Sequence, residues 1–139
     1  MLLHIPNRYS LSGMQLVSIY ACLCEPIRLR ILRLLAEGPL CVCHLQTILK
    51  ENQVKVSKHL AYLKTRGLVE VRRKQHWRVY EIKQPTRRVL AANLACLEEC
   101  VRDEAVFQRD AARLRRLKAH PDGTPACAES AASILPSRS

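Results

Sequence analysis

The chain has few of the features that mark membrane, secreted or catalytic proteins. Its 139 residues contain no apolar run long enough to span a bilayer. The first six residues lack the basic segment, long apolar stretch and small-residue cleavage site of a secretion signal. There is no Gly-rich phosphate-binding loop and no recognisable catalytic triad. We therefore expect a cytoplasmic protein that is not an enzyme and has no membrane partner.

Acidic residues are scarce as well, with 12 Asp and Glu against 23 Lys and Arg, and the sequence pI is near 9.8. Such a basic balance favours polyanionic partners and is typical of nucleic-acid binding proteins, although a membrane-surface or ribosomal protein shares it. The length and the 48% apolar fraction are those of one globular domain.

Cysteine, in contrast, is abundant. The chain has seven cysteines, an odd number, and no secretion signal, which argues against a disulfide framework and favours metal, metalloid or redox chemistry. Six of them form close pairs in the sequence, and the seventh, Cys127, stands alone. The pairs are Cys22/Cys24, Cys41/Cys43 and Cys96/Cys100.

Helical periodicity dominates the first half of the chain. Apolar residues recur at helical spacing over residues 10–24, with the stripe Leu11, Met14, Val17, Tyr20 and Ala21. Pro26 is well placed to start a second helix, which Gly38-Pro39 ends. The second helix has one apolar face, and three arginines are expected outside it, namely Arg28, Arg30 and Arg33.

Two short helices follow, separated by a polar turn. They are predicted over residues 40–49 and 53–66, and Asn52 can cap the second one. The second of these helices is expected to bury Val56, Leu60 and Leu63. It is expected to expose a largely basic face, namely Gln53, Lys55, Lys58, His59 and Lys64. Two short helices around a tight turn, the second one basic, indicate a helix-turn-helix.

Beyond Gly67 the periodicity changes from helical to alternating. Residues 68–71 and 77–82 are predicted to form two strands joined by the basic segment 72–76. Because this segment has no Gly and no Asn-Gly, the turn is expected to be longer than two residues. A helix-turn-helix followed by a basic hairpin is a winged helix. The predicted fold class is therefore mainly α with a β-hairpin.

Residues 85–120 are predicted to form one long helical stretch. Its apolar stripe is longer than a lone domain of this size could cover. The stretch could fold back on its own core, or it could form a dimer interface together with the first helix. We favour the homodimer, because recognition by a winged helix usually needs two half-sites.

The domain organisation follows from these elements. The DNA-binding and dimerisation domain is placed at residues 10–120. A flexible arm is expected at residues 1–9, and a disordered tail rich in Ala, Ser and Pro at residues 121–139.

Three ordered motifs resemble those of the ArsR/SmtB family of metal-responsive winged-helix repressors, and of its arsenic-responsive branch in particular. Leu40-Cys41-Val42-Cys43-His44-Leu45 is similar to that branch's Leu-Cys-Val-Cys-Asp-Leu. Ser57-Lys58-His59-Leu60 resembles its Ser-Arg/Lys-His-Leu, and Pro26-Ile27-Arg28-Leu29 resembles its Pro/Thr-x-Arg-Leu. The resemblance covers about residues 11–118 and implies a homodimer that binds a palindromic operator and leaves it when an inducer binds.

The sequence departs from the family pattern at several positions. His44 replaces the usual Asp, and Val54 replaces a frequent Pro early in the recognition helix. Gln46 stands where arsenite sensors with three cysteines on this helix carry the third. The long C-terminal helix lacks the His ligands of the zinc site that other members build there.

Cys41 and Cys43 are the first choice for a metal site. Trivalent arsenic is thiophilic and takes up to three thiolates, and the first turn of a helix favours thiolate. On a regular helix, residues i and i+2 point about 200° apart, so the pair can share one ion only if that turn unwinds. Unwinding would deform the helix that positions residues 53–66. Alternatively, both cysteines are small core residues.

Cys96 and Cys100 are the second candidate pair, because positions i and i+4 share a helix face. They could hold a two-thiol inducer such as methylarsenite, bridge protomers, or line the dimer seam. Cys22 and Cys24 are expected to have a packing role, although one of them could supply a third thiolate. Cys127 in the tail is expected to be incidental.

The predicted DNA-binding surface combines the recognition helix with the wing. In the major groove Gln can pair with adenine and Lys with guanine or phosphate. The residues expected there are Gln53, Lys55, Ser57, Lys58 and His59. The wing is expected to neutralise phosphates or to reach the minor groove through Arg72, Arg73, Lys74 and Arg78. If these charges were an isolated run, a solvated surface would be the better interpretation. Because they lie in a helix-turn-helix, we expect them to bind double-stranded operator DNA.

The sequence therefore predicts a transcriptional repressor that leaves its operator when As(III) or a methylated trivalent arsenical binds cysteine thiolates, with no cofactor required. A thiol redox-sensing repressor is one alternative. A constitutive DNA-binding protein with structural cysteines is another.

Overall fold

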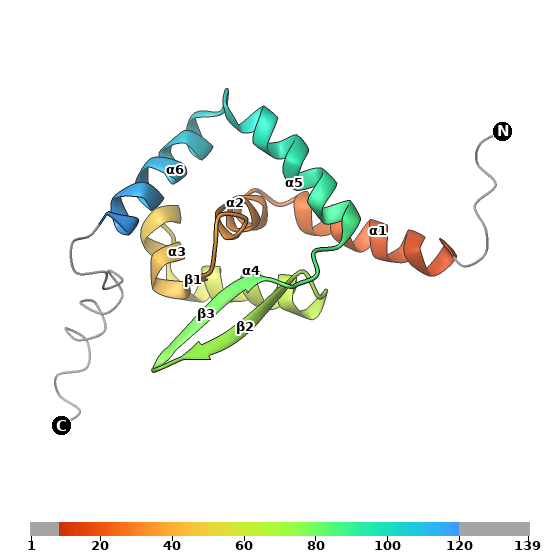
Figure 1. The fold of residues 1–139 in the computed structure, drawn as a ribbon, viewed down its shortest axis with the longest axis horizontal. Helices are drawn as coiled ribbons and strands as arrows, with labels where there is room; N and C mark the ends of the chain where they lie inside the picture. Colours follow the sequence, from red (N-terminus) through yellow and green to blue (C-terminus); the bar gives the residue numbers. More distant parts are fainter. Residues whose placement is uncertain (1–8, 120–139) are drawn as a thin grey trace.

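The protein is described by a computed structural model that covers residues 9–119 (Figure 1). The predicted arm at residues 1–9, apart from Tyr9, and the predicted tail at residues 121–139 with Cys127 lie outside the described residues. The elements in chain order are α1 (Tyr9–Leu23), α2 (Pro26–Leu35), β1 (Leu40–Cys41), α3 (Val42–Leu49), α4 (Gln53–Thr65), β2 (Val69–Lys74), β3 (Trp77–Ile82), α5 (Arg88–Val101) and α6 (Ala105–Lys118). The three strands form one antiparallel sheet in the order β1-β3-β2.

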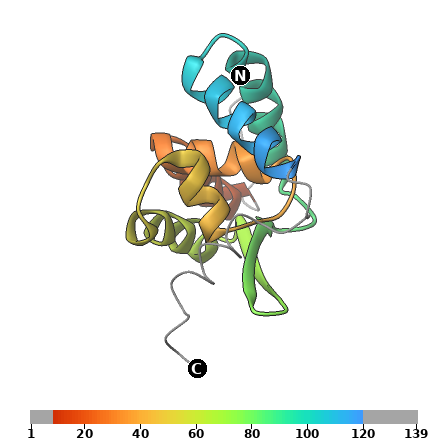
Figure 2. The same ribbon diagram turned by 90° about the vertical axis from the view of Figure 1, so that its left-hand side faces the viewer.

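Helix α2 lies at the centre of the molecule and begins as the sequence predicts. The Glu25 side chain accepts a hydrogen bond of 2.8 Å from the backbone N–H of Arg28, and Pro26 occupies the first helical position, where no donor is needed. The helix ends before Gly38, whose φ of +148° is rarely adopted by residues with a side chain. Most of its apolar residues are buried, because other helices surround it (Figures 1 and 2).

Helices α3 and α4 form the predicted helix-turn-helix. Lys50 ends α3 in the left-handed conformation, with φ +59°, and Asn52 begins α4 by accepting a 2.8 Å hydrogen bond from the backbone N–H of Lys55. The residues Val56, Leu60 and Leu63 are fully buried, as predicted. They fix the face of α4 that contacts the core, and therefore also the face that it leaves outside.

Strands β2 and β3 form the predicted wing, which projects away from the α5 and α6 side of the molecule (Figure 2). Lys74 pairs with Trp77, so only Gln75 and His76 connect the strands. The prediction of a longer turn is therefore wrong. Gln75 supplies the turn by adopting φ +57°, a conformation for which Gly or Asn is the usual choice.

The third predicted helix begins two residues later than expected. Leu40 and Cys41 form the short strand β1 and pair with Tyr80 and Val79 of the wing. Sequence periodicity cannot show this pairing, because the partner strand lies about forty residues further along the chain. The start of α3 is consequently joined to the middle of strand β3 in the wing through backbone pairing.

The predicted single helix over residues 85–120 is wrong in one respect, because it is two helices. The chain turns at residues 102–104, where the Gln108 side chain donates a hydrogen bond to the carbonyl of Arg102. Helix α6 then returns to contact α2 and α3, and Leu114 is fully buried there (Figure 1). The alternative that this stretch folds back on its own core is thus correct for α6.

Helix α1 leaves much of its apolar surface outside this chain's core. Ile19 and Cys22 are buried, but Val17 and Tyr20 of the predicted stripe are 68% and 47% exposed. Leu16 is also exposed. None of the helices in the described part of the chain is long and apolar enough to cross a membrane.

Candidate nucleic-acid interface and thiol sites

The outer face of α4 is the first part of the candidate interface. The side chains of Gln53, Lys55 and Lys58 are exposed, whereas Ser57 is half-buried. Lys55 contacts Glu51, with an Nζ to Oε2 distance of 3.2 Å, and this pair is open to solvent. The structure thus exposes three of the five predicted helix residues and leaves Ser57 partly accessible.

His59 departs from this pattern, because its side chain is only 14% exposed. The prediction that it is exposed is wrong, since the α1–α2 connection covers it. Its Nδ1 lies 3.5 Å from a guanidinium nitrogen of Arg28 and 3.8 Å from a carboxylate oxygen of Glu25. Burial lowers the pKa of His59, with the Glu25 carboxylate opposing the shift. The neutral ring is therefore the favoured form, and its Nδ1 accepts from Arg28.

Arg28 explains why the Pro26-Ile27-Arg28-Leu29 motif matters for this interface. Its guanidinium donates to the carbonyls of Ala21 and Cys22 at the end of α1 and lies 4.0 Å from the centre of the Tyr62 ring in α4. One side chain thus joins α1, α2 and the recognition helix.

The wing supplies three cations that point to solvent, Arg73, Lys74 and Arg78. The fourth predicted wing residue, Arg72, is already paired within the hairpin. Its guanidinium contacts both carboxylate oxygens of Glu81, at 2.6 and 2.8 Å. Arg72 therefore has less charge to offer a phosphate than its neighbours have.

Cys41 and Cys43 do not lie on one helical turn. Cys41 is the N-cap of α3, with extended backbone angles of φ −86° and ψ 166°, and it is 5% exposed. Its backbone N–H points at Nδ1 of His44, 3.5 Å away, as in a capping box. Cys43 is half-buried in the first turn. The expectation that the pair sits about 200° apart on a regular helix is therefore wrong for Cys41.

A cleft of about 620 Å³ lies between β1, the start of α3 and the wing. Cys41 and His44 line it from the helix side. Arg73, Lys74 and Trp77 line it from the wing. The cleft brings the Cys41 thiol near Arg73 and Lys74. The sequence does not predict this, because the helix side and the wing side of the cleft meet only through the pairing of β1 with β3.

Cys96 and Cys100 lie together on α5, and both are exposed. The charge of the neighbouring Cys96 raises the pKa of the Cys100 thiol. This is the adjacency that the i, i+4 spacing predicts.

The remaining described cysteines differ from each other. Cys22 is fully buried in the core, and burial raises the pKa of its thiol, with nearby arginines opposing the shift. This placement agrees with the packing role predicted for Cys22, whereas Cys24 is exposed. Among the residues that the structure describes, no group of three or more His, Cys, Asp or Glu side chains could hold a metal ion.

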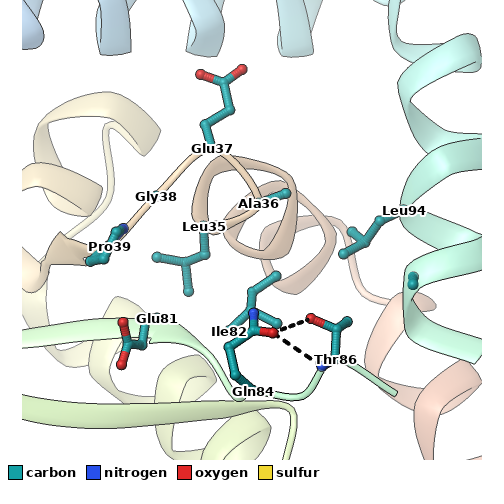
Figure 3. Close-up of a pocket in the computed structure, with 11 residues that line it drawn as sticks. Leu35, Ala36, Glu37, Gly38, Pro39, Glu81, Ile82, Gln84, Thr86 and Leu94 are labelled. Atoms are coloured by element: carbon teal, nitrogen blue, oxygen red, sulfur yellow. Dashed lines mark hydrogen bonds between the residues drawn. The ribbon is translucent and has the colours of Figure 1, made fainter. Parts of the chain in front are cut away.

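A second cleft, of about 370 Å³, lies between the end of α2, the end of β3 and α5 (Figure 3). Its carboxylates are already engaged, since Glu37 pairs with Arg33 and Glu81 pairs with Arg72. Gln84 accepts two hydrogen bonds from Thr86 at its edge. No cysteine or histidine lines this cleft, so it offers nothing to a thiophilic ligand.

Helix α6 is attached to the helix-turn-helix by charged groups that sequence reasoning missed. Asp110 is 2% exposed and accepts two hydrogen bonds of 2.8 Å from Arg30 of α2. Arg113 donates to the carbonyl of Ile48 at 2.7 Å, at the end of α3. Arg33, expected outside the apolar face of α2, is also buried and contacts Glu37 and Glu98.

Comparisons with known proteins agree with this architecture. Residues 25–71 match the sequence profile of the family described as bacterial regulatory protein, arsR family. The chain is 33% identical over 111 residues to the arsenic resistance transcriptional regulator ArsR1 of Pseudomonas putida, covering 79% of this chain and 85% of that protein. It is 40% identical over 67 residues to the arsenical resistance operon repressor of Escherichia coli, covering 48% of this chain and 57% of that repressor.

Solved structures show the same fold. A homodimeric winged helix-turn-helix DNA-binding domain from Mycobacterium bovis matches with a TM-score of 0.58 and 28% identity, covering 75% of this chain and 97% of that one. HlyU from Vibrio cholerae matches with a TM-score of 0.58 and 26% identity, covering 64% of this chain and 94% of that one.

Proposed function

The chain belongs to the ArsR family of bacterial regulatory proteins, and we propose that it is a repressor that binds a palindromic operator as a homodimer and leaves it when a trivalent arsenical binds its thiols. The family and fold are those of DNA-binding transcriptional regulators, so the expectation that the chain is not an enzyme is confirmed. The names of two relatives, from P. putida and E. coli, support arsenic as the signal.

DNA recognition is assigned to α4 and the wing. The outer face of α4 exposes Gln53, Lys55 and Lys58, which are side chains that can read the major groove. Arg73, Lys74 and Arg78 extend the positive surface along the hairpin to the flanking phosphates. His59 has an indirect role: it contacts Arg28 and Glu25, and these contacts hold α4 in position.

A second copy of the chain would cover the exposed apolar surface of α1. Leu16, Val17 and Tyr20 form an exposed apolar stripe on α1, and exposed large apolar patches mark interfaces. The structurally similar domain from M. bovis is a homodimer. A two-fold dimer presents two recognition helices, which requires a palindromic operator.

The position of Cys41 is the observation that carries the sensing proposal. This residue belongs to β1, which pairs with the wing, and it also caps α3, the first helix of the DNA-reading unit. A ligand that binds both Cys41 and Cys43 would disturb the pairing of β1 with the wing and the cap of α3 together. The strained element is then the joint between α3 and the wing, rather than a turn of α3 itself.

A thiol redox sensor is the second candidate, and Cys96 and Cys100 are the observation in its favour. Two exposed and adjacent thiols can bind an arsenical that takes two thiolates, and they can also be oxidised. Both reactions would act on α5, between the dimer seam and α6.

One titration separates these functions. An operator is selected from a pool of random duplexes, and its release from reduced dimer is followed as arsenite, methylarsenite, cadmium, zinc and peroxide are added. We expect release by the arsenicals, lost in Cys41→Ser/Cys43→Ser and kept in Cys96→Ser/Cys100→Ser. Release by peroxide alone would favour the redox sensor, and no response to any agent would favour constitutive binding.

The DNA assignment has its own test. Lys55→Ala/Lys58→Ala should abolish operator binding, because both lysines lie on the outer face of α4. The control is Lys83→Ala/Arg88→Ala, which removes the same charge from exposed positions outside the proposed surface. Equal operator affinity in the two double variants would refute the assignment.

A further inference from the structure

The cleft between α3 and the wing, which Cys41 lines, is large compared with the space that one arsenic atom on this thiol needs. The cleft has a volume of about 620 Å³ and extends from Cys41 to the residues of the hairpin that line it. A phenyl ring fits within it, since pockets of roughly 300–1,000 Å³ hold drug-sized ligands. The excess volume suggests that the arsenic carries a substituent.

The number of thiols points in the same direction. Inorganic arsenite is fully coordinated by three thiolates, but no three-ligand group occurs in the described part of the chain. An organic arsonous acid has one As–C bond and two hydroxyl groups, so two thiols complete it. Two As–S bonds form, two As–O bonds break, and the two thiol protons leave with the hydroxyl groups as water. No oxidant or reductant is needed.

The lining of the cleft then indicates what the substituent should be. Trp77 and Val79 offer an aromatic and an apolar surface, Lys74 pairs with Trp77 across the hairpin, and Arg73 also lines the cleft. Within the described residues no carboxylate forms an ion pair with either cation, in contrast to the engaged Arg72. An aromatic ring with an acidic group would meet both surfaces.

We infer that this cleft binds the substituent of a trivalent aromatic arsenical that carries a carboxylate, with its arsenic on Cys41 and Cys43. The inference rests on the proposed function and deepens it. Arg73 and Lys74 also belong to the proposed DNA-binding surface of the wing, so a carboxylate that engages them would compete with operator phosphate. Ligand charge and arsenic–sulfur bonding therefore act together in operator release.

Trp77 allows a direct test, because it is the only tryptophan of the chain and it lines the cleft. Reduced, DNA-free protein is titrated with methylarsonous, phenylarsonous and 4-carboxyphenylarsonous acid while Trp77 fluorescence is followed. We expect the phenyl compound to bind more tightly than the methyl compound. The carboxyphenyl compound should bind about tenfold more tightly than the phenyl compound at low salt, as a carboxylate with two partly exposed cations provides.

Matched variants locate the effect. In Arg73→Gln/Lys74→Gln the preference for the carboxyphenyl over the phenyl compound should fall below about twofold. In Lys83→Gln/Arg88→Gln, which removes the same charges from exposed positions outside the cleft, the preference should remain. A preference that is absent in the wild type, or that survives in the first variant, overturns the inference.

The two failures can be told apart. If methylarsonous acid binds in a Cys41-dependent manner and releases the operator while the carboxylate gives no advantage, the inference fails and the proposed function stands. If none of the three compounds changes Trp77 fluorescence or releases the operator, both fail.

Discussion

The buried pair of Asp110 and Arg30 gives the sharpest prediction about this fold. Asp110→Asn keeps the shape of the side chain but removes the charge that Arg30 faces at 2.8 Å. Loss of one partner from a buried ion pair costs roughly 3–5 kcal/mol, because the other charge remains without compensation. Arg30 is 14% exposed, so water relieves part of this penalty and we expect about 3 kcal/mol.

The assay is thermal and chemical unfolding at a fixed protein concentration, because dimerisation makes stability depend on concentration. A loss of about 3 kcal/mol lowers the Tm by about 12 °C for a domain of this size. The control is Glu99→Gln, whose side chain is 73% exposed and 4.0 Å from Arg102, and it should change stability by less than about 0.5 kcal/mol.

A rescue variant separates the charge from the shape. Arg30→Met/Asp110→Leu replaces both partners with apolar groups and should recover most of the lost stability. The reasoning is refuted if Asp110→Asn is no more destabilising than Glu99→Gln, or if the rescue variant is less stable than Asp110→Asn.

Three further predictions concern α4. Asn52→Ala removes the cap of this helix and should lower the free energy of unfolding by about 1 kcal/mol, whereas Asn52→Asp, measured in the same denaturant series, should retain most of it. Burial lowers the pKa of His59 below its ordinary value of 6.5, so the unfolded chain binds more protons than the folded one. The contribution of His59 to stability should be complete above about pH 6.5 and lost as the pH falls below it, and His59→Gln should flatten the measured profile in that window. Lys58→Ala should reduce the slope of log K against log salt for operator binding by about 0.9 in anisotropy titrations, and an unchanged slope would argue against a phosphate contact.

Local signals explain the parts of the fold that the sequence predicts well. Pro26, Gly38 and Asn52 mark helix boundaries through their own backbone or side-chain chemistry, and each occurs at the expected place. The apolar spacing of Val56 and Leu60 likewise predicts the buried face of α4. These features need no information from elsewhere in the chain.

The failures involve distant contacts or unusual local choices. The pairing of Cys41 with Val79 and the contact of Arg30 with Asp110 join segments far apart in sequence. Gln75 adopts a positive φ in the turn, which its residue type does not predict. The corner after α5 contains neither Gly nor Pro, so the periodicity there is continuous although the helix is not.

For the candidate sites, the sequence predicts which thiols and cations lie near each other only within one element. The adjacency of Cys96 and Cys100 follows from helical spacing, and the structure shows it. The cleft that joins Cys41 to Arg73 and Lys74 depends on β1, a strand of two residues that no periodicity reveals.

The brevity of β1 also limits which insertions and deletions this chain can tolerate. Surface loops usually accept an added residue at little cost. The loop at residues 36–39 is different, because alternate residues of a strand face opposite sides. One extra residue there, or one fewer, that shifts β1 by one position against β3 would turn the side chain of Cys41 to the opposite side of the sheet. Variation in length should therefore be excluded at this loop and accepted at the tip of the wing.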